Sequence, residues 1–83
     1  LKHATEIVRS DVPVSVYCEE VLAVLRASPG AVGFLDFFRH ERSRTRIIGI
    51  FLALLELARR KAIRVRERRT DGVLIEVSIR EGS

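Results

Sequence analysis

Cysteine, proline and histidine are scarce in this 83-residue sequence, and tryptophan and methionine are absent. The single cysteine, Cys18, excludes an internal disulfide and favours a reducing compartment. No apolar run is long enough to span a bilayer, because Arg46, Glu56 and Arg59 interrupt the most apolar stretch, so no membrane contact is expected. Lys2 is not followed by the apolar segment of a signal peptide. Since the chain begins with leucine, we expect a fragment of a longer protein.

Residues arranged for catalysis or for holding a metal or cofactor are also lacking. Neither His3 nor His40 has a carboxylate or a cysteine at the spacing of a metal ligand. Cys18 falls among apolar positions of a predicted helix, which favours a small buried side chain over a nucleophile. Gly30 and Gly33 fit no spacing of a phosphate-binding loop. The sequence therefore predicts a protein without catalytic activity, metal or cofactor.

The most informative stretch is a strongly apolar helix predicted between residues 46 and 60. Its large apolar side chains sweep roughly 220° of the helix circumference, whereas a stripe that faces a core needs about 100°. These side chains are Ile47, Ile48, Ile50, Phe51, Leu52, Leu54, Leu55 and Leu57. The edge that contains Ile48, Leu52 and Leu55 exceeds the needs of a small core, which predicts a surface for another protein. Packing under the N-terminal segment, or pairing of two copies, is the alternative.

Arginine, far more than lysine, supplies the net charge of +4. One group surrounds the start of the apolar helix and a second follows the helix: Arg39, Arg42, Arg44 and Arg46, then Arg64, Arg66, Arg68 and Arg69. Such groups allow contacts with nucleic-acid phosphates or an acidic protein, although a solvated surface is the simpler interpretation. Between Ile47 and Leu57 the helix offers only Glu56 as a polar side chain. Phosphates repel a carboxylate, so this helix is not expected to read base edges.

Helical periodicity predicts three helices within one small domain that spans residues 12–80. We interpret residues 1–11 as the end of a linker and residues 81–83 as a frayed C-terminus. The helices are predicted at Val16–Ala27, from Pro29 to about His40, and from about Arg44 to about Lys61. The expected N-caps are Ser15, Ser28 and Ser43. The expected core positions of the first two helices are Tyr17, Val21, Val24 and Leu25, and Phe34, Leu35, Phe37 and Phe38.

After the third helix the apolar period changes to two: Ile63 and Val65 alternate with arginines, and Val73, Ile75, Val77 and Ile79 follow at every second position. This predicts two antiparallel strands that turn one face, with these apolar residues, toward the core. An Asp-Gly turn at residues 70–72 joins them. Earlier in the chain, the alternating valines and the proline of residues 12–16 predict a short edge strand. Three helices followed by a hairpin form an α+β winged helix. The third helix takes the recognition position and the hairpin is the wing.

The segment at residues 51–57, FLALLEL, is followed by a basic pair and a hairpin. This combination resembles the C-terminal winged-helix domain of the segregation and condensation protein A (ScpA) family, the kleisin subunit of the bacterial SMC–ScpA–ScpB condensin. Residues 12–25 resemble the short strand and first helix of that domain, and residues 34–38 resemble its phenylalanine-rich second helix. The resemblance extends from about residue 12 to residue 79.

The resemblance implies that the domain docks on the ATPase head of one SMC subunit. In the full-length protein, other regions would bind ScpB and the neck of a second SMC subunit. The closed ring would act in chromosome condensation and segregation, in the bacterial cytoplasm at the nucleoid. Apolar residues four apart on the third helix contribute to the SMC contact in this family, here Phe51 and Leu55. They lie toward the same edge as Ile48 and Leu52, although Phe51 also suits a core position.

Further contacts are predicted at the rim of this surface, from Arg44 and Arg59, and on the wing, from Leu74 and Glu76. The sequence departs from the family pattern in the wing, where Glu67 replaces the usual glutamine and the turn is longer. Two alternatives stay open at this point. One is a DNA-binding winged helix that uses the arginine-rich helix start and the wing, and the other is a homodimerisation module that uses the apolar edge.

Overall fold

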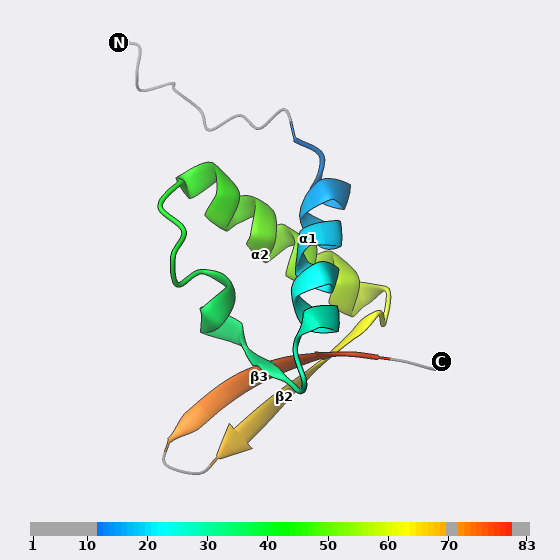
Figure 1. The fold of residues 1–83 in the computed structure, drawn as a ribbon, viewed down its shortest axis with the longest axis vertical. Coiled ribbons are helices and arrows are strands. Elements are labelled where there is room, and N and C mark those ends of the chain that lie inside the picture. Colours follow the sequence, from blue (N-terminus) through cyan, green and yellow to red (C-terminus); the bar gives the residue numbers. More distant parts are fainter. Residues whose placement is uncertain (1–11, 70–71, 81–83) are drawn as a thin grey trace.

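In the computed structural model, which describes residues 12–69 and 72–80, two α-helices pack together at the base of a three-stranded antiparallel sheet (Figure 1). The elements in chain order are α1 (Val14–Ala27), β1 (Val32–Gly33), the 3-10 helix η2 (Phe34–Phe37), α2 (Arg44–Arg59), β2 (Ile63–Arg69) and β3 (Val73–Ile79). The strand order is β1-β3-β2. The α+β class is confirmed. Within the described ranges, no helix is long and apolar enough to cross a membrane.

The start of α1 differs from the prediction. The helix begins at Val14 with Pro13 as its N-cap, so the predicted edge strand at residues 12–16 and the predicted cap Ser15 are wrong. Pro13 has extended backbone angles (φ −67°, ψ 154°), and its carbonyl accepts a hydrogen bond from the Val16 N–H at 3.0 Å. Proline lacks an N–H, which a helix start does not require, so it suits the first turn as well as a sheet edge.

The predicted second α-helix is also wrong. Ser28 ends α1 in an extended conformation and its hydroxyl donates to the carbonyl oxygen of Val24 at 2.8 Å. The short strand β1 and the single 3-10 turn η2 follow where a helix was expected. Three of the predicted core side chains of this segment do pack against the core: Phe34, Phe37 and Phe38. The fourth, Leu35, is 72% exposed.

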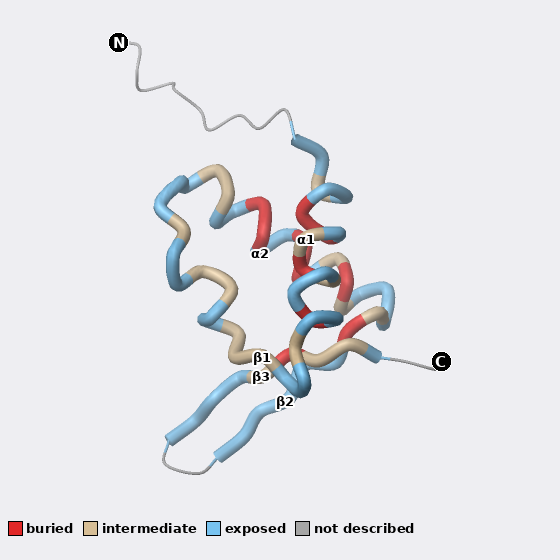
Figure 2. The backbone as a smooth tube through the Cα atoms, in the orientation of Figure 1, coloured by how far each residue is buried: buried red, intermediate tan, exposed pale blue. Residues whose placement is uncertain are grey.

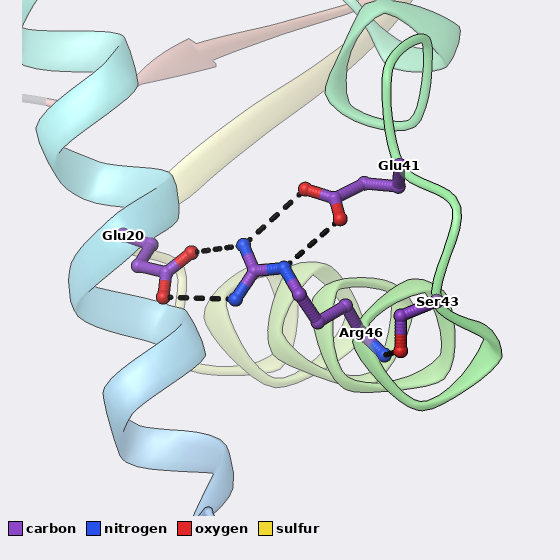
Figure 3. A network of polar contacts seen from close by, with 4 residues as sticks. All are labelled: Glu20, Glu41, Ser43 and Arg46. Atoms are coloured by element: carbon purple, nitrogen blue, oxygen red, sulfur yellow. Dashed lines mark hydrogen bonds and ion pairs between the residues drawn. The ribbon is translucent and has the colours of Figure 1, made fainter.

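The start of α2 agrees with the prediction and is tied to α1 through one side chain. The Ser43 hydroxyl accepts a hydrogen bond from the backbone N–H of Arg46 at 3.3 Å, as expected of an N-cap. The Arg46 guanidinium reaches Glu20 of α1 at 2.7 Å and Glu41 of the preceding turn at 2.9 Å (Figure 3). It also lies 5.5 Å from the ring centroid of Tyr17. Arg46 thus connects α1, the turn and α2.

α2 ends at Arg59, two residues before the predicted end. The N–H of Ala62 bonds the carbonyl of Leu57 at 2.9 Å, and the N–H of Lys61 bonds that of Ala58 at 3.0 Å. This pair of bonds is a Schellman motif, in which the residue after the cap adopts a left-handed conformation. Lys61 has that conformation, with φ 63°. The motif turns the chain directly into β2.

Ten buried side chains form one core between the two helices and the base of the hairpin (Figure 2). They are Tyr17, Cys18, Val21, Leu25, Ile50, Ala53, Leu54, Leu57, Ile63 and Val77. The prediction that Cys18 is a buried structural side chain agrees with its 4% exposure. The prediction for Val24 is wrong, because this side chain is 45% exposed and lines a hollow beside β1 and η2.

The two helices are in close contact at Gly49. A Cβ atom at this position would stand 2.5 Å from Cε2 of Tyr17, so the aromatic ring occupies the space that any side chain at position 49 would need. Such contacts below 3.0 Å force a shift of the neighbouring atoms. Gly49 therefore lets the backbone of α2 lie directly against the Tyr17 ring.

The hairpin is paired from Ile63 opposite Ile79 to Arg69 opposite Val73. The predicted turn residues 70 and 71 lie outside the described residues. Only the base of the inner face is buried by the helices, at Ile63 and Val77. Val65 stands directly opposite the buried Val77 but on the edge strand β2, and it is 50% exposed; Ile75, nearer the turn on the same face, is 39% exposed. The expectation of one core-facing side is confirmed at the base alone.

β1 is two residues long and covers only the last part of β3. Across the hairpin, the N–H of Arg80 bonds the carbonyl of Ala62 at 3.0 Å. Because alternate residues of a central antiparallel strand bond to opposite neighbours, Val77, Ile75 and Val73 direct their N–H and C=O groups toward the β1 side. Beyond the end of β1, η2 lies beside this side of β3, and Val73 and Ile75 border a hollow with Phe34 and Leu35.

Gly49→Ala is expected to destabilise the protein, although alanine favours a helix over glycine by about 1 kcal/mol. The new methyl group would collide with the Tyr17 ring, and overpacking of a core costs about 1–3 kcal/mol. Urea denaturation followed by circular dichroism measures the change. Gly30→Ala is the matched control, because a Cβ there meets nothing within 4 Å. Equal effects of the two substitutions would contradict the proposed close contact.

Candidate protein-binding surface

Four apolar side chains of α2 form an exposed strip, here called the α2 ridge. They are Ile48, Phe51, Leu52 and Leu55, with exposures of 43%, 43%, 44% and 52%. The opposite side of the helix, with Ile50, Ala53, Leu54 and Leu57, is buried in the core. The surplus apolar edge predicted from the sequence is therefore uncovered by the described residues. The alternative cover, residues 1–11, lies outside them.

Phe51 occupies one border of the α2 ridge. Its ring lies edge-on to Phe34 of η2, with centroids 6.4 Å apart and planes at 80°. Almost half of the side chain nevertheless remains accessible. The two sequence interpretations of Phe51, core or contact, therefore both hold in part: one edge of the ring supports η2 and the rest belongs to the surface.

Leu55 lies between two hollows. One, of about 400 Å³, separates the first turns of α1 from the second half of α2 and is lined by Val14, Cys18, Leu52 and Leu55, with Arg59 and Arg60 at its border. The other, of about 250 Å³, lies between α2 and the hairpin and is lined almost wholly by apolar groups. Its walls are Phe34, Leu54, Leu55, Ala58, Val65, Ile75 and Val77. Leu55 is thus the centre of a continuous apolar surface.

The predicted rim residues lie at different distances from this centre. Arg59 borders the larger hollow, where its guanidinium pairs with Glu56 at 2.7 Å. Arg60 pairs with the same carboxylate at 2.7 Å. Arg44 is the first residue of α2, eleven positions before Leu55, or about 16 Å along the axis. It borders none of the hollows beside Leu55, so only Arg59 joins the centre of the surface.

The predicted wing contacts, Leu74 and Glu76, do not join the α2 ridge. They alternate with the inward-facing Val77, so they lie on the outer face of the hairpin, and they border a separate hollow of about 540 Å³ beside η2. The exposed wing residues that line a hollow with Leu55 are Val65 and Ile75, beside the buried Val77. The sequence placed both on the core-facing side, and the structure leaves them 50% and 39% exposed.

The thiol of Cys18 is a titratable group of the hollow beside Leu55. Burial is the main cause that raises the pKa of the Cys18 thiol, and this disfavours the reactive thiolate. The thiol donates to the Ala53 carbonyl at 3.9 Å. His40 is exposed, His3 lies outside the described residues, and the described residues contain no group of three side chains that could hold a metal ion.

Hydrogen bonds from Arg59 and Arg60 lower the pKa of Glu56 from 4.5 to about 2. Because the folded-state pKa is depressed, the stabilisation is complete above about pH 4.5 and is lost as the pH falls toward about 2. Glu56→Gln should therefore lower the melting temperature at neutral pH and progressively less across that window. Thermal unfolding of both proteins as a function of pH measures this. A difference that persists undiminished at the acid end would contradict the assignment.

No protein-family model matches this chain, and no curated protein matches it. The α2 ridge, the hollows beside Leu55 and the charges around them are the features of the structure that bear on function.

Proposed function

We propose that this chain is a winged-helix domain of the kleisin type that docks, without catalysis or cofactor, on the ATPase head of an SMC protein. In the complete assembly, with ScpB and a second SMC subunit, such docking closes the condensin ring in chromosome condensation and segregation. The observation that carries the proposal is the exposed apolar α2 ridge with Leu55 between two hollows. The FLALLEL segment that resembles ScpA contributes Phe51, Leu52 and Leu55 to that ridge.

The order of elements supports the winged-helix part of the proposal. A helix and a short strand precede α2, and the β2–β3 hairpin follows it. The sheet order β1-β3-β2 places the first strand beside the last, as a wing requires when it packs on the helical body. In this comparison, η2 and the turn after it stand at the position of the second helix.

Docking by the α2 ridge has a simple physical basis. Each aliphatic side chain that becomes buried contributes about 1.5–3 kcal/mol, and a few central anchors carry most of the affinity of a typical interface. The two hollows beside Leu55 offer room for apolar side chains of the partner. The mixed charges of Arg59, Arg60 and Glu56 border this centre and favour one orientation of the partner.

The same face of α2 is poorly suited to reading nucleic acid. Its exposed side chains are aliphatic or aromatic, whereas base edges are read by hydrogen-bonding groups. At the helix start, Arg46 is bound by two carboxylates and Arg39 pairs with Asp36 at 2.6 Å. These pairs leave fewer free charges beside the ridge than the sequence indicated.

Leu55→Arg is expected to weaken binding to an isolated SMC head by at least about thirtyfold, the loss of one anchor of about 2 kcal/mol. The substitution places a charge at the centre of the surface, and the 52% exposure of Leu55 allows the fold to persist. Val24→Arg is the matched control, because Val24 is 45% exposed on α1, away from the ridge. Calorimetric titration measures binding, and circular dichroism verifies the fold of each variant.

Three results would count against this assignment. Unfolding of Leu55→Arg would place Leu55 in the core and overturn the site. Unchanged binding by a folded Leu55→Arg variant would overturn docking through the ridge. A concentration-dependent dimer in sedimentation, lost in Leu55→Arg and accompanied by no binding to the SMC head, would assign the ridge to homodimerisation.

A further inference from the structure

The outer face of the β2–β3 hairpin carries a row of arginines. Arg64, Arg66 and Arg68 occupy every second position of β2, and all are exposed. Because side chains alternate along a strand, these three point away from the buried Ile63. Their spacing along the strand is about 6.6–6.8 Å from one arginine to the next. The row therefore lies on a regular, paired strand and faces away from the helices.

The opposite strand adds little negative charge to this face. The residues paired with Arg64, Arg66 and Arg68 are Ser78, Glu76 and Leu74. Just past the end of β3, Arg80 continues the same alternation and is exposed. The outer face thus holds four arginines and one glutamate.

Ion pairing neutralises the arginines of the hairpin unequally. On the inner face, Arg69 is paired with Glu67 at 3.3 Å. On the outer face, Glu76 binds Arg68 at 3.2 Å, although it stands directly opposite Arg66. Within residues 12–69 and 72–80, neither Arg64 nor Arg66 forms an ion pair, so the outer face keeps a marked excess of positive charge.

We propose that the outer face of the hairpin binds the phosphate backbone of duplex nucleic acid. Guanidinium groups bind phosphate through two parallel hydrogen bonds, and a row of them on a rigid ribbon can follow a charged backbone without reading sequence. No aromatic side chain lies on this face, so it lacks the platforms on which single-stranded bases stack. Leu74 is its only large apolar side chain, which leaves an acidic protein without the apolar centre of a typical interface.

This site is separate from the surface proposed for docking. The α2 ridge adjoins the inner face of the hairpin, at Val65 and Ile75, whereas the arginine row occupies the outer face. Both surfaces can therefore be occupied at once. The nucleic-acid site also does not depend on the identity of the protein that binds the α2 ridge.

The simpler role for these arginines is to prevent another chain from pairing with the edge of β2. The two roles differ in their dependence on salt. Each phosphate contact contributes about 0.9 to the slope of log K against log salt concentration, whereas edge protection requires no binding to DNA. We therefore design the experiment around that slope.

The experiment measures fluorescence anisotropy of labelled DNA duplexes of two unrelated sequences between about 50 and 200 mM salt. For Arg64→Thr/Arg66→Thr, we expect the affinity for DNA to fall by at least about tenfold at the lowest salt. The slope of log K against log salt concentration should become smaller in magnitude by about 1.8. Threonine keeps the strand propensity. Arg26→Gln/Lys61→Gln is the matched control, because it removes two exposed positive charges that lie outside both arginine groups and form no ion pair with the described residues. We expect it to change affinity by less than about twofold on both sequences.

Several outcomes would overturn the proposal. One is that the parent chain does not bind DNA at the lowest salt. Another is that both double variants lose the same DNA affinity, because such a loss would reflect net charge alone. Polyglutamate that competes as well as the duplex at equal total charge would assign the row to an acidic protein instead. A folded Arg64→Thr/Arg66→Thr variant that only aggregates, with unchanged DNA affinity, would leave edge protection as the role of the arginines.

Discussion

The contact of Tyr17 with Gly49 is the constraint on which the rest of this small domain depends. It brings α2 against α1 at one point of its length and so decides which side of α2 faces the core. Arg46 holds the same crossing from one turn away, since it lies over the Tyr17 ring and binds carboxylates on both sides. With the crossing fixed, the apolar side chains on the remaining side of α2 stay about half exposed among the described residues, even where the Phe51 ring meets Phe34, and they form the α2 ridge.

Features set by local chemistry were predictable from the sequence. Ser43 caps α2, the hairpin follows its period of two, and the surplus apolar width of α2 is visible without a structure. The second helix was not predictable, because phenylalanines at positions 34, 37 and 38 suit a 3-10 turn as well as an α-helix. The two-residue strand β1 has no sequence signal of its own, since its pairing with β3 is wholly a long-range interaction.

Alternation along the hairpin reveals which side chains share a face but not how far the helices cover that face. For this reason Val65 and Ile75 were expected in the core, whereas the structure places them in the hollow beside Leu55. The same alternation separates two chemistries on one ribbon. Val65 and Ile75 on the inner face continue the surface of α2, and the outer face carries Arg64, Arg66 and Arg68. A substitution on one face can therefore be made with little disturbance of the other.

The shortness of β1 also affects how the domain would assemble in concentrated solution. Among the described residues, no strand pairs with β3 beyond β1, beside the exposed Val73, whereas the second edge of the sheet, β2, is dense in charge. Aggregation into fibres requires two adhesive edges, so that each added chain offers a template to the next. When each sheet has one such edge, two copies pair through it and leave no adhesive edge for a third copy. Strand pairing of this domain would therefore end at a closed pair and would not propagate.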